Sequence, residues 1–366
     1  MVDCVVIGGG LIGMLSAWEL RRSGLSVTIV EQGPCGMESS WAGGGILSPL
    51  YPWRYADAVT ALAYWSQAHY PAFIQHLHEQ TGIDPQLQKN GLLILDMEQA
   101  TSAANWAQCW GYRLERLDAD GIRYLEPALG TVPDAALWLP DIAHVRNPRL
   151  LKALKESLIN QSVEIREHSA VKHLAQSGGR VQGVVLENET LSAANVLVAG
   201  GAWSGKLLAT TGLDLPVRPV RGQMILYRGE PGLVSRIVLS QDRYVIARRD
   251  GRVLVGSTLE ETGFDRSTTE SAGKALAAEA LRLIPALVNY DIERHWAGLR
   301  PGSPEGIPYI GAHPEITGLY VNSGHFRNGV VLGLASSRLL ADILLEREPI
   351  VPVQPYEISI VNKRLN

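Results

Sequence analysis

Cysteines are scarce in this sequence, and its basic residues are not clustered. Its 366 residues include only three cysteines, Cys4, Cys35 and Cys109, and no C-x-x-C pair. This excludes a disulfide framework, and we expect a reduced, soluble, cytoplasmic protein. The 33 basic and 37 acidic residues give a formal net charge of −4, with no cluster of lysine and arginine. We therefore expect no nucleic acid as the main partner.

Long hydrophobic runs are missing as well. The longest stretch without Asp, Glu, Lys or Arg is 58–78, which contains Pro71 and three histidines. It is too polar for a membrane span, and its histidines lack the spacing of metal ligands, so we expect neither a membrane nor a metal site. Residues 4–18 resemble the apolar core of a signal peptide. Asp3 stands where a signal peptide carries basic residues, so we do not expect one here.

The first 31 residues carry the strongest local signal. Residues 3–7 form a short apolar run typical of a buried parallel strand, and the glycine-rich turn 8–13 follows. Residues 14–22 have a helical pattern, and a second strand pattern at 26–30 leads into Glu31. Strand, G-x-G-x-x-G turn, helix, strand and acid in this order predict a dinucleotide-binding βαβ unit.

Each part of this unit has a physical task. Gly8 permits the tight turn, Gly10 lets the backbone approach a pyrophosphate, and Gly13 lets the helix pack closely on the strand. The helix N-terminus offers free N–H groups to the phosphates. Glu31 can accept hydrogen bonds from ribose hydroxyls and would repel a 2′-phosphate, which disfavours NADP. The alternative is a doubly wound domain whose glycines only tighten a turn.

A second loop of small residues, 38–49, favours FAD over NAD. Small side chains and bare backbone suit a long flat ligand that lies across the chain. A nicotinamide enzyme would continue with alternating strands and helices, whereas 51–140 reads as irregular, aromatic-rich and partly helical. The aromatic side chains Tyr51, Trp53 and Tyr55 either flank an active-site entrance or pack between domains.

The remaining chain predicts strands of two kinds. Residues 163–171 predict a strand near the dinucleotide, and 180–186 and 191–199 predict antiparallel neighbours. Gly200 and Gly201 follow at a carboxyl strand end, where open α/β sheets bind ligands. After Pro216 the pattern becomes β, with predicted strands at 220–227, 244–248 and 252–257, a hairpin turn at Asp250-Gly251 and a helix over 270–284.

Two motifs with arginine stand in the last third of the chain. Arg300 lies in the sequence HWAGLRPG, an apolar segment constrained by glycine and proline. Arg327 lies in SGHFRNG, between a predicted strand at 319–322 and a helix that begins at Val330. This second helix N-terminus can face the edge of a flavin ring and stabilise negative charge that develops there.

Together these motifs resemble the FAD-dependent D-amino acid oxidases, and within them most closely the glycine oxidases of the ThiO type, linked to thiamine biosynthesis. The resemblance spans nearly the whole chain. It implies that FAD is bound by Gly8, Gly10, Leu11, Ile12, Gly13, Glu31, Gln32, Ser39, Ser40, Gly44, Gly45, Ile46, Val171, His325, Phe326, Arg327, Asn328, Gly329, Val330 and Val331. It also implies that Arg300 binds the substrate carboxylate, with Tyr244 and Arg327 beside it, and that the protein is a homotetramer.

Each substrate-site residue has a structural alternative. Arg300 can instead pair with a structural carboxylate, and Arg327 can hold its loop or contact flavin rather than substrate. Tyr244 heads a strand, where tyrosine commonly packs. His325 fits loop architecture better than a proton shuttle. At position 259 a bulky apolar wall residue is expected, and Leu259 leaves the preferred substrate size open.

The implied reaction is the oxidative deamination of glycine and small D-amino acids or amines, with hydride transfer from the substrate Cα to flavin N5 and reoxidation by O₂. A planar guanidinium suits the substrate carboxylate because it binds both oxygens. One alternative is an FAD-dependent D-amino acid or hydroxy-acid dehydrogenase with another electron acceptor. The other alternative is a flavin-binding module without turnover. Related sarcosine oxidases attach flavin to a late cysteine, which this chain lacks, so FAD should be non-covalent.

The predicted fold class is α/β, with a discontinuous Rossmann-like FAD domain and a substrate domain built on an antiparallel or mixed sheet. The FAD domain is predicted to contain 1–50, 141–214 and 297–366. The substrate domain is predicted to contain 51–140 and 215–296. A small amino acid and O₂ would meet where the two domains join.

Overall fold

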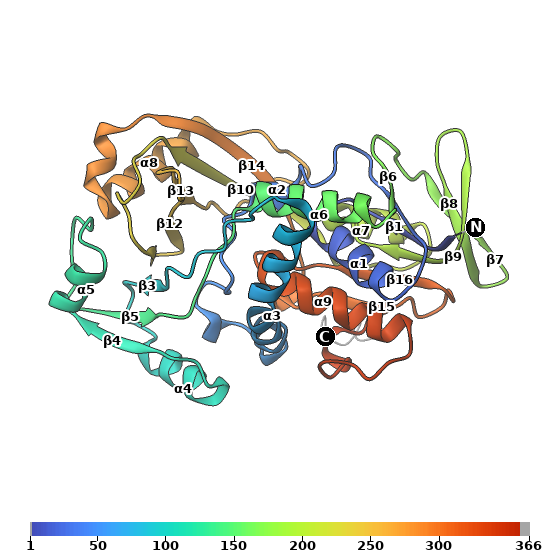
Figure 1. Ribbon diagram of the computed structural model, residues 1–366, viewed down its shortest axis with the longest axis horizontal. Helices are drawn as coiled ribbons and strands as arrows, with labels where there is room; N and C mark the ends of the chain where they lie inside the picture. Colours follow the sequence, from blue (N-terminus) through green and yellow to red (C-terminus); the bar gives the residue numbers. More distant parts are fainter. Residues whose placement is uncertain (1, 359–366) are drawn as a thin grey trace.

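The computed structural model describes residues 2–358; residue 1 and residues 359–366, which the sequence places in the FAD domain, lie outside the described residues. Two eight-stranded sheets form the frame of the α/β molecule. Figure 1 shows them at opposite ends, with helices α2 (Ser39–Ala42) and α3 (Asp57–Thr81) between them. No helix within residues 2–358 is long and apolar enough to cross a membrane.

The first sheet is built mainly from parallel strands in the order β15-β16-β9-β1-β2-β6. Its strands are β1 (Val2–Ile7), β2 (Val27–Val30), β6 (Glu164–Arg166), β9 (Thr190–Val198), β16 (Leu319–Ser323) and the antiparallel edge strand β15 (Tyr309–Ala312). The inner strands are short runs of buried β-branched and apolar residues, as parallel strands covered on both faces require.

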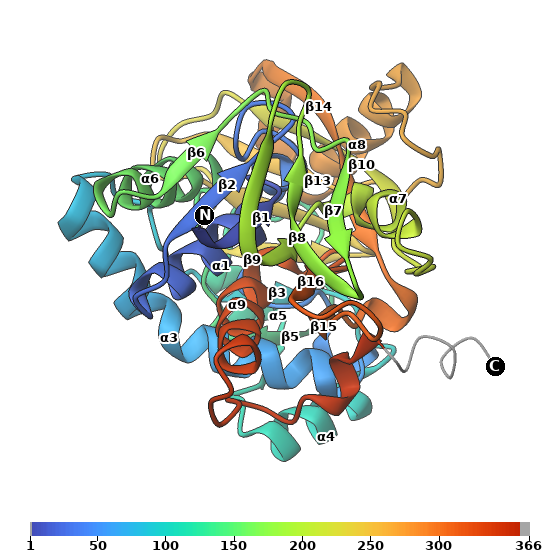
Figure 2. The same ribbon diagram turned by 90° about the vertical axis from the view of Figure 1, so that its right-hand side faces the viewer.

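A hairpin extends this sheet. Strands β7 (His173–Ser177) and β8 (Arg180–Val185) pair with each other, and β8 pairs antiparallel with β9, as the sequence predicts. Figure 2 looks at this end of the molecule, where β7, β8 and β9 run side by side. The prediction of one strand over 163–171 is too long, because β6 ends at Arg166 and the chain then turns away.

Four helices pack with the first sheet through one buried apolar cluster. They are α1 (Leu11–Arg22), α3, α6 (Asn147–Asn160) and α9 (Gly329–Leu344). The sequence predicts 51–140 to be irregular and only partly helical, whereas α3 is one continuous helix of 25 residues. Its buried stripe, which includes Leu62 and Tyr70, joins α1 and α9, although the sequence assigns 51–140 to the substrate domain. The division into domains stays a prediction.

The second sheet has the order β14-β10-β13-β12-β11-β3-β5-β4 and is mostly antiparallel. Its strands are β3 (Leu92–Ile94), β4 (Glu115–Asp118), β5 (Ala135–Leu139), β10 (Arg218–Tyr227), β11 (Ile237–Ser240), β12 (Arg243–Ala247), β13 (Val253–Gly256) and β14 (Ile292–Gly302). The predicted hairpin at Asp250-Gly251 joins β12 to β13, whereas β11 had no strong sequence signal.

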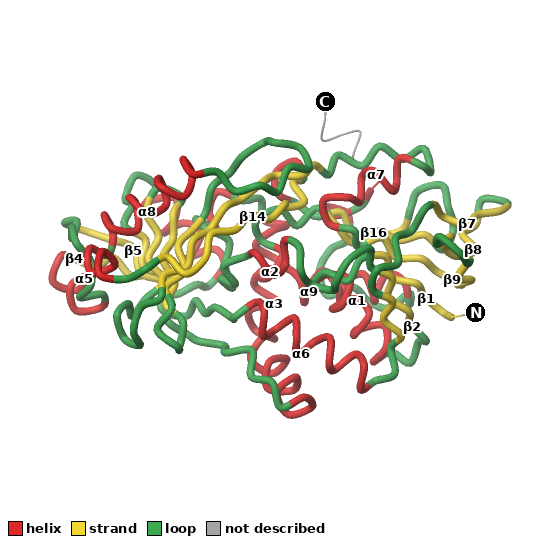
Figure 3. Tube along the Cα trace, turned by 90° about the horizontal axis from the view of Figure 1, so that it is seen from above, coloured by secondary structure: helices red, strands yellow, loops and turns green. Residues whose placement is uncertain are grey.

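Helices α4 (Ala100–Trp110), α5 (Ala119–Leu125) and α8 (Glu270–Leu283) belong to the same half, and α7 (Ser204–Ala209) follows β9. Seen from above, the strands form two separate groups with helices between them (Figure 3). Since β1, β2, β9 and β16 run parallel, their carboxyl ends share one edge of the first sheet. Ligands bind at this edge in open α/β sheets.

Candidate active site

A cavity of about 410 Å³ opens at the edge where the parallel strands end. The segments that follow β1, β2, β9 and β16 form one part of its wall. Residues of β10, β12 and β14 in the second sheet form another. Its volume lies in the range of small-molecule sites, and its wall combines both halves of the molecule.

The glycine-rich turn has the geometry that its sequence predicts. Gly8 has φ +112°, which a residue with a side chain rarely adopts, and a Cβ at Gly13 would overlap the carbonyl oxygen of Gly8. Gly13 therefore packs α1 against the turn and does not itself line the cavity. The N–H of Leu11, in the first turn of α1, donates to Ser40 Oγ at 2.9 Å.

Glu31 holds this turn in place. Its carboxylate accepts hydrogen bonds from the N–H groups of Gly9 at 2.7 Å and Gly33 at 3.0 Å. The side chain lines the cavity beside Gln32. The acid at the end of the second strand thus shapes the pyrophosphate turn, a role that the sequence motif alone did not reveal. Its contact with a ribose stays a prediction.

The small-residue loop passes closely over the second sheet. A Cβ at Gly44 would lie 3.0 Å from the Tyr244 ring, and one at Gly45 would overlap the Val145 carbonyl. Asn147 Nδ2 donates to the carbonyls of Ser40 at 2.8 Å and Gly43 at 3.1 Å. Glycine is needed here for packing between the halves of the molecule as well as for space in the cavity.

A buried arginine that the sequence did not single out also fixes this loop. Arg248 donates to the carbonyls of Gly44 at 2.7 Å and Val145 at 3.0 Å, and its Nη1 lies 3.0 Å from His144 Nδ1. Burial lowers the pKa of Arg248 to about 10 and that of His144 to about 3. At neutral pH the arginine is charged and the histidine is neutral, so their contact avoids repulsion between two cations.

The second glycine-rich loop leads into α9. His325 Nε2 lies 3.0 Å from Ser336 Oγ, and burial lowers the pKa of His325 to about 3. A neutral imidazole held by the helix fits the structural interpretation of His325 better than a proton shuttle. Phe326 has φ +45°, which turns the chain before Gly329 begins the helix. Val331 is buried in the core and does not line the cavity.

Unpaired polar atoms at this edge fit a polar ligand. Asn322 Oδ1, His325 Nδ1 and Asn328 Nδ2 are buried and have no hydrogen-bond partner within residues 2–358, and all three residues line the cavity. The N-termini of α1 and α9 also reach its wall. Donors, acceptors and two positive helix ends in one elongated cavity suit a dinucleotide with a polar ring.

Arg300 lies on β14 at the wall shared with the second sheet. Nη1 donates to the carbonyl of Thr258 at 3.1 Å and Nη2 donates to Ser257 Oγ at 2.7 Å. Within the described chain it has no ion pair with a carboxylate. Burial first, and the nearby Arg327 and Arg243 second, lower the pKa of Arg300 to about 10. It therefore stays charged at neutral pH and can bind an anion.

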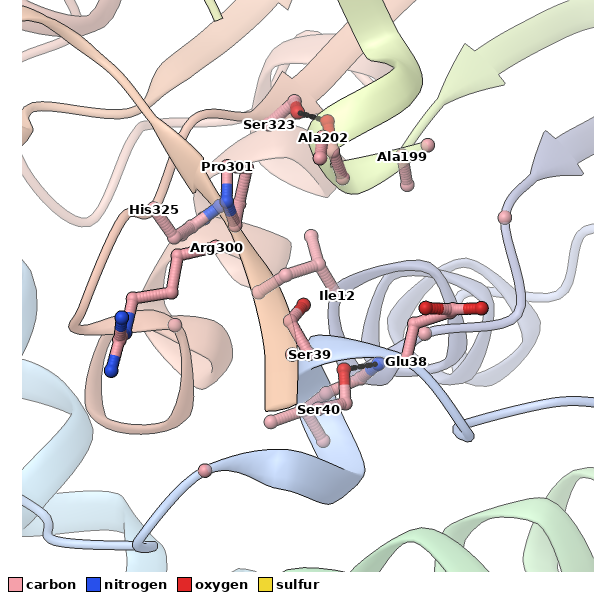
Figure 4. A pocket seen from close by; sticks show the side chains of 18 of the residues that line it. Ile12, Glu38, Ser39, Ser40, Ala199, Ala202, Arg300, Pro301, Ser323 and His325 are labelled. Atoms are coloured by element: carbon pink, nitrogen blue, oxygen red, sulfur yellow. Dashed lines mark hydrogen bonds between the residues drawn. The ribbon is translucent and has the colours of Figure 1, made fainter. Parts of the chain in front are cut away.

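Figure 4 shows Arg300 reaching away from its strand, with Glu38, Ser39 and Ser40 further along the cavity. Its guanidinium lies over Gly222 on the neighbouring strand, where a Cβ would overlap it. Gly222 pairs with Gly298, two residues before Arg300. Sequence reasoning missed Gly222 and Ser257, since only the register of the strands brings them to Arg300.

The other two predicted substrate-site residues also line the cavity. Tyr244 is 6% exposed, and its hydroxyl lies 3.8 Å from Met224 Sδ. Arg327 Nη1 lies 3.5 Å from Asp242 Oδ1, so it has the carboxylate partner that Arg300 lacks. Leu259, expected at an apolar wall, is 54% exposed and does not line the cavity.

Most of the predicted residues therefore meet in one cavity. The predicted residues that line it are Gly8, Gly10, Leu11, Ile12, Glu31, Gln32, Ser39, Ser40, Gly44, Gly45, Ile46, Val171, Tyr244, Arg300, His325, Phe326, Arg327, Asn328, Gly329 and Val330. Residues of this wall that the prediction omitted include Glu38, Lys172, Trp203, Lys206, Met224 and Asn322. Their contacts to bound molecules stay predictions.

The chain belongs to the FAD dependent oxidoreductase (DAO) family, which it matches over residues 3–343. FAD is accordingly its cofactor. It is 49% identical over 353 residues to a glycine oxidase of Pseudomonas aeruginosa, covering 96% of this chain and 97% of that protein. It is 31% identical to the bifunctional protein ThiO/ThiG of Synechocystis, covering 94% of this chain and 52% of that protein. The crystal structure of glycine oxidase from Geobacillus kaustophilus superposes with a TM-score of 0.92 at 29% identity and covers 98% of both chains.

Proposed function

We propose that this protein is an FAD-dependent amine oxidase that oxidises glycine and small amines or D-amino acids. With glycine the reaction is glycine + O₂ + H₂O to glyoxylate + NH₃ + H₂O₂. The relatives named glycine oxidase, which match nearly the full length of the chain, support this substrate class. We also propose that the imine product feeds the synthesis of the thiamine thiazole.

The observation that carries the proposal is that Arg300 is buried and charged but has no anionic partner in the described chain. Its guanidinium faces the cavity and is charged, and within residues 2–358 its hydrogen bonds go to a hydroxyl and a carbonyl. Desolvated arginine without an anionic partner is costly, and a bidentate carboxylate supplies the missing charge. A small amino acid bound there has its carboxylate fixed, and its α-carbon is then oriented by the same contact.

The protein residues bind and orient the reactants. FAD, when bound, supplies the two-electron oxidation of the substrate C–N bond. Arg300 would hold the carboxylate, with Tyr244 and Arg327 beside it. We propose no acid–base pair, because an amine that binds unprotonated needs none. The wall residues of the two glycine-rich loops, the Glu31 carboxylate and the loop 38–46 would hold the cofactor.

Several further properties belong to this proposal. We propose that FAD is bound non-covalently, because no cysteine follows Cys109. We propose a cytoplasmic homotetramer, and a division into an FAD domain (1–50, 141–214 and 297–366) and a substrate domain (51–140 and 215–296). The alternative function, a dehydrogenase with another electron acceptor, has no specific structural observation in its favour.

A peroxide-coupled assay tests the proposed function. The purified yellow protein is given glycine, sarcosine, D-alanine, D-proline and L-alanine in turn. We expect peroxide from glycine and small D-amino acids and none from L-alanine. If none of the five yields peroxide but one of them bleaches the flavin anaerobically, the protein is the alternative dehydrogenase and not an oxidase. No bleaching at all would refute an amino-acid substrate.

A further inference from the structure

The two arginines in the cavity wall differ in their ionic surroundings. Arg300 has no carboxylate within 4.0 Å in the described chain, whereas Arg327 Nη1 lies 3.5 Å from Asp242 Oδ1. Arg327 is the less accessible partner, with 16% of its side chain exposed against 49% for Asp242. Asp242 itself does not line the cavity, so it acts on the cavity only through Arg327.

Asp242 stands in a tight turn with positive φ angles. Gln241 and Asp242 form the two-residue loop between β11 and β12, with φ +48° and +61°. Such a turn favours asparagine, aspartate and glycine, so its backbone suits Asp242 and strains Gln241.

The surrounding contacts hold the Asp242 carboxylate in place. The N–H of Gln241 donates to Asp96 at 3.0 Å, and the N–H of Asp242 donates to the Tyr51 hydroxyl at 3.3 Å. On the outer side, Arg54 Nη1 lies 3.7 Å from Asp242 Oδ2. The Arg54 guanidinium stacks on the Tyr51 ring at 3.8 Å. Asp242 is thus fixed between an outer arginine and the arginine in the cavity wall.

We propose that Asp242 is a positioning residue that selects substrates by charge. By pairing with Arg327 it leaves Arg300 as the cation that accepts a carboxylate, so amino acids with one carboxylate are favoured and those with a second anionic group are disfavoured. This inference rests on the proposed function, since it requires an amino-acid substrate. Removing the Asp242 charge leaves Arg327 without its carboxylate partner and so releases it for a second substrate carboxylate.

The test compares Asp242→Asn with the matched control Asp250→Asn in the FAD-loaded enzyme. Asparagine tolerates the positive φ of the turn, so the variant keeps its fold. Asp250 also lies in a hairpin turn and is shared by two arginines, Arg146 and Arg252, but neither of these lines the cavity as Arg327 does. Each protein is assayed with glycine and with iminodiacetate, which is glycine with a second carboxymethyl group on its nitrogen.

We expect the ratio of kcat/KM for iminodiacetate to that for glycine to rise about tenfold in Asp242→Asn, mainly through a lower KM for iminodiacetate, and to stay unchanged in Asp250→Asn. The rise should shrink at high salt, because exposed charges are screened. Asp242→Gly removes the same charge and should give the same ratio. An unchanged ratio in both Asp242 variants with normal FAD content would overturn the proposal.

Calorimetric titration with glycolate and malonate separates this proposal from the proposed function. Both ligands carry carboxylates but no amine, so neither reports amine oxidation. Tighter malonate binding in Asp242→Asn than in the wild type would support the charge selection even if glycine is not oxidised. Equal malonate affinity in the two proteins would refute the charge selection even if glycine is a good substrate.

Discussion

The part of the cavity proposed to bind FAD, called the cofactor part, and the part proposed to bind the amino acid, called the substrate part, are built by different means. The cofactor part consists of backbone groups and helix ends that follow parallel strands, as at Gly10 and Gly329. The substrate part consists of side chains on an antiparallel sheet, where Arg300 rests over Gly222 of the next strand. The first therefore depends on contiguous motifs, and the second depends on strand register.

Removing Arg300 should produce the largest loss of activity, and it should affect the substrate part without affecting the cofactor part. In Arg300→Ala the substrate carboxylate loses its charged partner, so kcat/KM for glycine should fall by about a hundredfold to several thousandfold. The bound-flavin spectrum should stay unchanged, because the cofactor part does not use this side chain. Steady-state kinetics and absorbance check both. Loss of flavin would show that Arg300 is structural, and Arg252→Ala in the turn between β12 and β13 serves as the control.

Removing Glu31 should affect the cofactor part instead. Glu31→Ala leaves the N–H groups of Gly9 and Gly33 without their acceptor and loosens the turn. We expect FAD to bind about tenfold to a hundredfold more weakly. Titration of the apoprotein with FAD measures this, and Glu164→Ala on the neighbouring strand β6 should leave the affinity unchanged. Wild-type affinity in Glu31→Ala would exclude the predicted role.

A methyl group at Gly222 should affect the substrate part by displacing Arg300. In Gly222→Ala the new Cβ overlaps the guanidinium, which must move within a packed wall. We expect kcat/KM for glycine to fall about tenfold while FAD content stays near wild type. Gly121→Ala in α5 is the control. Wild-type kcat/KM would contradict the displacement of Arg300, and loss of the flavin together with activity would mean that strand register governs the cofactor part as well.

Two buried histidines, His325 in the cavity wall and His144 beside Arg248, should give the smallest effect, visible as a dependence of stability on pH. Burial lowers the pKa of His325 and of His144 from 6.5 to about 3, so the folded protein binds their protons less readily than the unfolded chain. Their contribution is present above pH 6.5 and is lost as the pH falls toward 3. Between pH 6.5 and 5 the free energy of unfolding should fall by up to about 1.4 kcal/mol per pH unit for each histidine.

Denaturant unfolding at several pH values measures this slope. His144→Gln should reduce the slope by one histidine's share, although the loss of its contact with Arg248 lowers stability at every pH. His295 and His313 shift in the same direction through burial and remain in both proteins. A slope that does not change in the variant would mean that His144 already carries a proton in the folded state.

The sequence predicted the secondary structure around the cofactor part well, because its motifs are local. The turn 8–13, the second glycine-rich loop and the order of elements around them are each contiguous in the chain. The full extent of helix α3 was not predicted, because Pro71 and polar residues interrupt the apolar stripe that packs on α1 and α9. The strand β11 was missed because its turn uses Gln241 and Asp242 in place of asparagine and glycine.

The contacts of the substrate part were beyond sequence reasoning. Arg300 itself was identified from its motif, but Gly222 and Ser257 reach it only through strand pairing. Arg248 was also overlooked, since nothing in its local sequence shows that it will bind the carbonyls of Gly44 and Val145. Such contacts depend on which distant segments of the chain lie side by side, and this cannot be derived from a single sequence.

The placement of α9 has a consequence for how the protein matures. The wall of the cofactor part needs Gly10 from the first strand–helix unit and Gly329 from the start of α9. A chain still on the ribosome therefore cannot complete this wall until nearly all of it has been made. FAD can stabilise only the full-length product, and fragments that end before α9 would have to persist without the cofactor's help.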